Sequence, residues 1–272
     1  MCLLFVFNCF KIQKKTGFTV ENKLKKSADF LCNYASAFLC NGAHTARVVE
    51  NVANIAKTWG FGAHLSVFIS HITLNIYDEN NPENRRTQVK TNTPFGVNLA
   101  LLVKLNRLSE NIQKQHFNSN EAQFFLNQIL RLPKPPFWAN LLFLSLANMA
   151  FCRLFGGDLG ALFCIFLATS CGICLRHFFI FKKIDTRIQY FLCAFLVSFL
   201  AYLGIYFNIT QTASIAIIGS ILYLIPGVLI FNVFVDILYE HTLMAIARAV
   251  HMLVLMTALA AGVFMTMSFF AF

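Results

Sequence analysis

The chain has 272 residues, of which 57% are hydrophobic and only 12% are charged. Ordinary soluble domains carry about 25% charged residues, so this composition argues against a protein that is soluble throughout. The net charge of +10 is compatible with a nucleic-acid-binding protein, but the basic residues form no single strip interleaved with aromatic residues. Cytoplasmic segments of a membrane protein, which are rich in Lys and Arg, account for the charge better.

The charge is concentrated in the first half of the chain. Residues 1–135 contain 16 Lys and Arg against 8 Asp and Glu, whereas residues 136–272 contain 6 and 4. We therefore divide the sequence near the prolines at 133–136. The expected architecture is a membrane protein with an N-terminal tail (1–23), a small α+β cytoplasmic domain (24–135) and an all-α transmembrane domain of five helices (136–272).

Periodicity predicts the elements of the cytoplasmic domain. Helical spacing of apolar residues indicates helices over residues 24–39 and 45–59. Alternation predicts strands over 64–70 and 72–76 with a bulge or tight turn between them, and a third strand over 85–91. Two more helices are expected over 97–115 and 119–132, the last one capped by Ser119.

Five long apolar runs follow, over residues 137–155, 159–175, 190–207, 213–235 and 249–270. A bilayer core of about 30 Å needs about 20 helical residues, so each run can cross a membrane with some tilt or thinning. Basic and uncharged connections alternate, which predicts that the N-terminus lies inside, in the cytoplasm, and the C-terminus outside. The basic residues that set this orientation are Arg131, Lys134, Arg176, Lys182, Lys183, Arg187 and Arg248.

The fourth apolar run contains the strongest candidates for a substrate or ion pathway. Pro226 and Gly227 weaken the helix near its middle, and broken helices in transporters direct a positive helix end toward an anionic group. Asn232 and Asp236 follow on one face of the helix. A carboxylate at membrane depth is a functional candidate. The alternative is that Pro226 only kinks the helix and that Asp236 meets lipid headgroups.

Other polar residues of the membrane segment have two interpretations each. Arg248 is suited either to bind a substrate carboxylate bidentately or to anchor the helix at the interface. His241 either shuttles protons or has a structural role. Asn148 is deep enough to bond another helix, and Arg153 is expected to pair with Asp158 across a turn.

Motifs of several enzyme classes are absent from the sequence. It contains no phosphate-binding loop for ATP, no nucleophile elbow and no His and carboxylate cluster with metal-ligand spacing. We therefore expect neither an enzyme nor a cofactor or metal. Uphill transport would then need an ion gradient or a partner ATPase.

One stretch of the N-terminal domain resembles the opening signature of the threonine/serine exporter family, in which a Gly-Ala-acid-Thr run precedes Arg-Val-Glu. This chain has His44 where the family usually has Glu, and Val49 separates Val48 from Glu50. The residues that match the signature, and to which the resemblance gives a supporting role, are Gly42, Thr45, Arg47 and Glu50.

Later blocks resemble the same family in chain order, up to about residue 262. They are residues 96–99 with 105–108, residues 151–157, and residues 224–227 with Asn232, Asp236, His241 and Arg248. The resemblance implies a secondary exporter of small hydrophilic metabolites, with threonine and serine as named substrates. Full-length members carry about ten spanning helices in two halves, so it also implies a partner, a second five-helix membrane subunit.

Our leading hypothesis is thus one subunit of an exporter that moves threonine- or serine-type amino acids or small organic acids across the inner membrane. Besides the second subunit, the expected partners are the small-molecule substrate and the lipid bilayer, and no nucleic acid. An intramembrane protease with Asp158 and Asp236 as paired carboxylates is an alternative. The predicted topology argues against it, because it separates the two groups by about 30 Å of bilayer. A non-transporting regulatory subunit is the third possibility.

Overall fold

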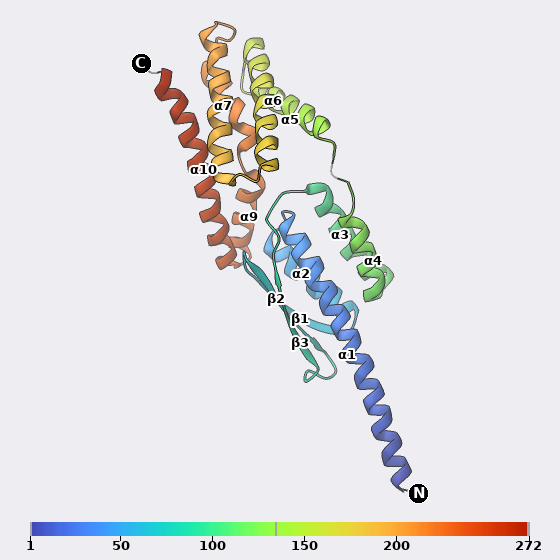
Figure 1. The fold of residues 1–272 in the computed structure, drawn as a ribbon. Helices are drawn as coiled ribbons and strands as arrows, with labels where there is room; N and C mark the ends of the chain where they lie inside the picture. Colours follow the sequence, from blue (N-terminus) through green and yellow to red (C-terminus); the bar gives the residue numbers. More distant parts are fainter. Residues whose placement is uncertain (1, 134, 271–272) are drawn as a thin grey trace. The chain divides into compact units, whose positions relative to one another are not determined.

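The computed structural model describes residues 2–133 and 135–270, with the side chains of residues 21–133 and 135–269. The predicted orientation residue Lys134 lies outside these residues. The chain forms two compact units (Figure 1), which we describe separately. Unit 1 comprises Met1–Leu132 and Val228–Arg248, and unit 2 comprises Pro133–Gly227 and Ala249–Phe272.

Unit 1 combines helices with one small antiparallel sheet. Its strands pair in the order β1-β2-β3, and a tight turn at residues 68–70 joins the first two. Of the two predicted connections, a bulge or a tight turn, the structure has the turn, and it lies closer to the N-terminus than predicted. The elements of this unit are α1 (Cys2–Cys40), α2 (Thr45–Thr58), β1 (Phe61–Val67), β2 (His71–Asp78), β3 (Arg85–Thr91), α3 (Leu99–Gln115), α4 (Ser119–Leu130), α9 (Gly227–Leu238) and the first turns of α10 (Thr242–Phe270).

The core of unit 1 forms between the sheet and the helices that cover one of its faces. Every second residue of β2, Ile72, Leu74 and Ile76, is fully buried. These side chains belong to one cluster with Phe30 and Phe38 of α1, which lies across the sheet (Figure 1). This two-layer arrangement follows from the period-2 and period-3.6 patterns of the sequence and confirms the expected α+β character.

Three local predictions for unit 1 differ from the structure. The first strand covers Phe61–Val67 instead of residues 64–70. The first helix begins at Cys2 instead of residue 24, so the backbone of the expected tail is helical from residue 2 onward. The cap of α4 is Asn118, not Ser119. The Asn118 side chain accepts from the Glu121 backbone N–H at 3.0 Å, and the Glu121 carboxylate accepts from the Asn118 N–H at 2.9 Å. This is a full capping box, and it begins one residue before the predicted cap.

Unit 2 is entirely helical in its described part. It contains α5 (Phe137–Leu154), α6 (Leu159–Phe181), α7 (Thr186–Tyr206), α8 (Ala213–Ile221), the 3-10 turn η1 (Leu222–Leu224) and the remainder of α10. Among the described residues, α5, α6, α7 and α10 are long and apolar enough to cross a membrane. The bent pair formed by α8 with η1 and by α9 adds a fifth span if it counts as one, so the number is four or five.

The break predicted at Pro226 is present. After η1, Ile225 has extended backbone (φ −64°, ψ 122°), the conformation that a following proline favours. A new helix then begins at Gly227. The apolar run 213–235 is therefore two short helices rather than one continuous span.

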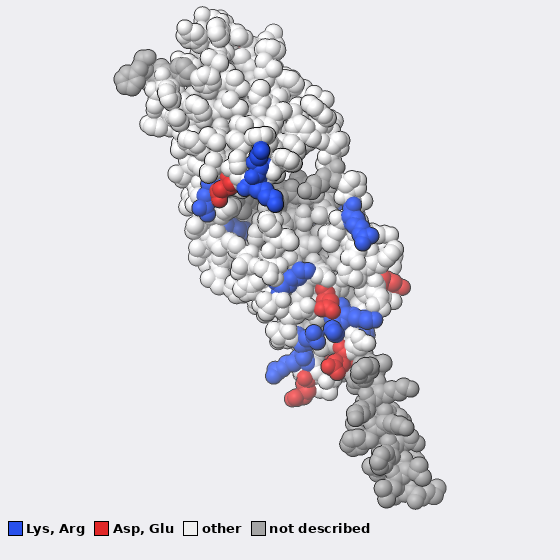
Figure 2. All heavy atoms as spheres, in the orientation of Figure 1, with Lys and Arg blue, Asp and Glu red and all other residues white. Residues whose placement is uncertain are grey.

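The surface of unit 2 is that of a membrane protein. Leu154, Leu159 and Phe181 are 80% exposed or more, and large apolar side chains are exposed along α5, α6, α7 and α10. Soluble proteins rarely expose apolar surface on this scale. On the face shown in Figure 2, charged side chains gather over unit 1 and near the α6–α7 turn, and most of unit 2 is uncharged. The chain is a multi-pass membrane protein.

The buried face of β2 gives a direct test of the fold. Leu74→Ala should lower the stability of the full chain by about 2–5 kcal/mol, because it leaves a cavity between the sheet and α1. The matched control is Val89→Ala on β3, where the side chain is 62% exposed and the expected change is within about 0.5 kcal/mol. The measurement is the thermal unfolding of the detergent-solubilised protein, and equal shifts for the two variants would contradict the described core.

Candidate functional site

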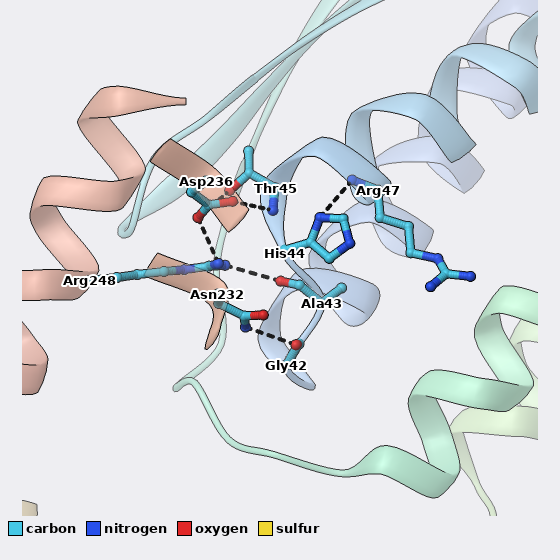
Figure 3. A network of polar contacts seen from close by, with 8 residues as sticks. All are labelled: Gly42, Ala43, His44, Thr45, Arg47, Asn232, Asp236 and Arg248. Atoms are coloured by element: carbon cyan, nitrogen blue, oxygen red, sulfur yellow. Dashed lines mark hydrogen bonds and ion pairs between the residues drawn. The ribbon is translucent and has the colours of Figure 1, made fainter. Parts of the chain in front are cut away.

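A buried polar cluster in unit 1 joins three segments that are far apart in the sequence (Figure 3). Its centre is the carboxylate of Asp236 on α9. One oxygen, Oδ2, lies 2.8 Å from Nη1 of Arg248 and accepts a hydrogen bond from the Thr45 hydroxyl at 3.1 Å. The other oxygen, Oδ1, accepts from the Thr45 backbone N–H at 2.8 Å. Asp236 and Arg248 are 0% and 4% exposed.

The turn between α1 and α2 supplies the backbone of this cluster. After α1 the chain reverses at Gly42, whose φ of +109° lies in the region that favours glycine. The next helix begins at Thr45, and the first N–H groups of a helix have no partner inside it. Asp236 accepts one of these N–H groups. Its negative charge is therefore placed at the positive end of the α2 dipole.

Two further side chains bind the same turn. Nη2 of Arg248 donates to the carbonyl of Ala43 at 3.1 Å, and Nδ2 of Asn232 donates to the carbonyl of Gly42 at 2.9 Å. Asn232 and Asp236 are one helical turn apart and face the same segment, as their spacing predicts. The α9 and α10 residues thus hold the 42–45 turn through its backbone as well as through Thr45.

The energetics of this cluster depend on keeping its members together. Burying a carboxylate and a guanidinium costs several kcal/mol for each ion, and the cost is offset only when the pair has good geometry and further hydrogen bonds. Here Asp236 accepts three hydrogen bonds and Arg248 donates two. In this conformation both groups bind each other and the turn, and neither presents its charge to solvent.

His44 links the cluster to the start of α2. It is the N-cap residue, and its Nδ1 accepts from the Arg47 N–H at 3.3 Å. Its ring stacks on Tyr239 with centroids 6.2 Å apart. Burial lowers the pKa of His44, the nearby Asp236 opposes this effect, and the positive charges of Arg47 and Arg248 add to it. The neutral ring is therefore favoured, and only a ring with unprotonated Nδ1 can accept the capping hydrogen bond.

The other predicted residues of unit 1 lie around this cluster. Nε of Arg47 donates to Oδ1 of Asn106 on α3 at 3.0 Å, and Glu50 is exposed on α2. The backbone N–H of His241, which precedes α10, donates to the carbonyl of Asp236 at 2.8 Å. Pro226 and Gly227 belong to unit 2 and form the break before α9.

In unit 2, the predicted residues near the α5–α6 turn form a separate polar cluster. Arg153 does not pair with Asp158 in the structure: it donates to the carbonyl of Gly157 at 3.0 Å. Asp158 caps α6 and accepts hydrogen bonds from Thr210 at 2.6 Å and Thr212 at 3.0 Å. These hydroxyls and the Gln211 N–H hold the pKa of Asp158 well below its usual range.

The cluster around Asp158 ties the α5–α6 turn to the α7–α8 loop. Both connections therefore lie at the same end of unit 2, as expected for a succession of spanning helices. Sequence reasoning missed Thr210 and Thr212, because hydroxyls in an uncharged loop carry no distinctive signal. Asn148, as predicted, bonds a neighbouring helix, through Thr169 of α6 at 3.2 Å.

Comparison with known proteins agrees with these features. The family model of the threonine/serine exporters (ThrE) matches residues 29–270. The chain belongs to the threonine/serine exporter family. This is a family of transporters, so the protein is not an enzyme. Asp158 and Asp236 are engaged by separate sets of partners, and the protease hypothesis is rejected.

Two curated bacterial relatives align with the chain over most of its length. One, from Klebsiella aerogenes, is 23% identical over 245 residues, which cover 88% of this chain and 92% of the relative. The other, from Escherichia coli K12, is 23% identical over 256 residues, which cover 92% and 97%. Both are described as "Probable succinate transporter subunit YjjP". No solved structure matches the chain.

The buried ion pair predicts strong coupling between its two members. Asp236→Asn and Arg248→Gln should each destabilise the protein by about 3–5 kcal/mol, because each leaves the other charge buried and unpaired. The double variant should lose less than the sum of the two. Asp185→Asn, at the exposed α6–α7 turn, is the control and should be nearly neutral. Additive losses in thermal unfolding would contradict the described pairing.

His44 predicts a pH dependence of stability. Because its pKa is lower in the folded protein, the unfolded chain binds more protons at mildly acidic pH. The contribution of His44 is therefore complete above its unfolded pKa of about 6.5 and falls as the pH falls toward its folded pKa. His44→Asn keeps a capping side chain without the titration. Unfolding midpoints at pH 7.5 and 5.5 should differ more for the wild type than for this variant; equal differences would exclude His44 as the cause.

Proposed function

We propose that this chain is one subunit of a secondary exporter that moves small hydrophilic metabolites out across a bacterial inner membrane. The observation that carries the proposal is the family match over residues 29–270, together with two relatives that are named transporter subunits. The four or five candidate spans supply the membrane part that such a subunit requires. The proposed cargo is either threonine- or serine-type amino acids or small organic acids. The second class is suggested by the word succinate in the relatives' names.

The partner in this proposal is a second membrane subunit with five helices. Many transporters are built from two repeats with the substrate site between them, and four or five spans correspond to one such half. The word subunit in the names of both relatives supports this arrangement. The alternation of basic and uncharged connections supports a cytoplasmic N-terminus and a periplasmic C-terminus.

We assign the cluster around Asp236 a controlling role in this exporter. Its residues Asn232, Asp236 and Arg248 follow the Pro226 break, and all three hold the 42–45 turn. A substrate or ion that reached Asp236 or Arg248 would have to replace these internal bonds. The closed cluster is thus one state of a switch, and its opening exposes a carboxylate and a guanidinium together.

The polar side chains of this cluster are all bound to one another or to the 42–45 turn. This also supports a second candidate, a regulatory subunit that does not transport. Asp236→Asn separates the two. The transport rate is compared per assembled complex, because the substitution also destabilises the protein. An exporter subunit should lose transport in the complexes that still assemble, whereas a scaffold should keep the rate of each complex. Assembly is followed by co-purification of the two chains, and the exposed-site variant Asp185→Asn serves as control.

Counterflow of labelled cargo tests the proposed function directly. Membrane vesicles that contain this chain and the second subunit should accumulate labelled threonine, serine or succinate when preloaded with the unlabelled compound. Vesicles with either chain alone should not. If the pair assembles and moves none of the three, the proposed cargo classes are wrong.

A further inference from the structure

A second arginine of the described membrane segments, the partly buried Arg176 on α6, has no acidic partner among the described residues. It stands five residues before the end of the helix at Phe181. The guanidinium carbon lies 5.2 Å from the ring centroid of Tyr190, and Nε is buried without a hydrogen-bond partner among the described residues. This contrasts with Arg248, whose guanidinium is occupied by Asp236 and Ala43.

A second unpaired donor lies on the same side of α6. Tyr223 belongs to η1, just before the Pro226 break, and its hydroxyl packs against Gly172, where a Cβ would collide with it. Gly172 and Arg176 are four residues apart and share one helix face. The Tyr223 hydroxyl is buried and forms no hydrogen bond of normal geometry within the described residues. Its polar neighbours there include Cys193 and Arg176.

The Arg176 Nε and the Tyr223 hydroxyl are thus buried donors without a hydrogen-bond acceptor of normal geometry among the described residues. Leaving a buried donor unsatisfied costs about 1–3 kcal/mol, and an ionisable group in a membrane segment marks a functional site by default. An arginine fork binds a carboxylate through parallel N–H bonds, and a tyrosine hydroxyl adds a third donor. The chemical complement of the pair is therefore a small anion with a carboxylate group.

We propose that Arg176 and Tyr223 form a binding site for a substrate carboxylate, next to the break that precedes α9. The assignment rests on the proposed exporter function. Gly172 makes the site possible, because a side chain at that position would displace the Tyr223 hydroxyl. Tyr190 packs its aromatic face against the guanidinium, which favours a positive charge at this place.

Equilibrium binding of labelled succinate and labelled threonine to the purified full chain in detergent tests this site. Arg176→Gln should weaken binding about tenfold to a hundredfold, since a charge-assisted hydrogen-bond pair is lost. Tyr223→Phe and Gly172→Ala should weaken it about threefold to tenfold. Arg176→Lys, which keeps the charge but loses the planar fork, should fall between wild type and Arg176→Gln.

Arg187→Gln is the matched control, because it removes the same charge from the exposed start of α7. It should bind both compounds as the wild type does. Equal losses of binding for Arg187→Gln and Arg176→Gln would mean that the arginines attract the ligand only through their positive charge. This result would overturn the proposal. Wild-type binding of neither compound, or unchanged binding in a folded Arg176→Gln variant, would overturn it too. Gel filtration establishes that each variant is folded.

Counterflow with the second subunit separates this inference from the proposed function. Transport by the pair with an unchanged KM in Arg176→Gln would reject the carboxylate site and leave the exporter function standing. Absence of transport in the wild-type pair, together with binding that depends on Arg176, would reject the exporter function and retain the site. A KM raised in Arg176→Gln and Tyr223→Phe but not in Arg187→Gln supports both.

Discussion

The Asp236 carboxylate and the Arg248 guanidinium meet in the interior of unit 1, at the first turn of α2. A buried charge pair contributes little net stability compared with apolar residues of similar size, but the loss of one partner is severe. Such a pair therefore fixes a single arrangement of the segments that carry it. Here those segments are α9, the start of α10 and the 42–45 turn. The position of the turn decides where α2 begins.

The same constraint gives the family-like motif a physical meaning. Gly42 permits the reversal after α1, Thr45 supplies a backbone and a hydroxyl donor, and Asn232 holds a carbonyl of the turn. His44 caps α2 through Nδ1, which accepts a hydrogen bond from the Arg47 N–H. A neutral acceptor suits this position, because the α2 terminus already faces the negative charge of Asp236.

Much of the fold was predictable from local pattern. The predicted strands overlap all three observed ones, although the first strand and the turn after it lie closer to the N-terminus than predicted. The apolar runs located the helices of unit 2 but not all their ends, since α10 begins at Thr242 and α6 extends to Phe181. The cap of α4 was assigned one residue late, because both Asn118 and Ser119 are good caps and only the position of Glu121 decides between them. Arg153 was predicted to pair with Asp158, but it donates to the Gly157 carbonyl of the same turn.

The candidate site was predictable as a set of residues but not as an arrangement. Thr45, Asp236 and Arg248 were each singled out, for three different reasons. Their contact joins residues 191 positions apart and depends on packing that no local pattern records. The carbonyls of Gly42 and Ala43 have no sequence signal at all, since every residue has one. Arg176 was noted only as a charge that orients the chain, and its unpaired Nε is visible in the fold alone.

The short helix α9 lies between two places where the backbone departs from helical geometry. Before it stands the extended Ile225 with Pro226, and after it Glu240 adopts a φ of +62°, a conformation that costs a non-glycine residue about 1–3 kcal/mol. The Glu240 N–H donates to the carbonyl of Ile237 and the His241 N–H donates to that of Asp236, so α9 ends in a hydrogen-bonded helix cap. Asn232 and Asp236 both lie on α9. A rotation of this helix as one rigid element would therefore withdraw both side chains from the 42–45 turn at once. Opening of the cluster would then be an all-or-none event rather than a gradual loss of separate bonds.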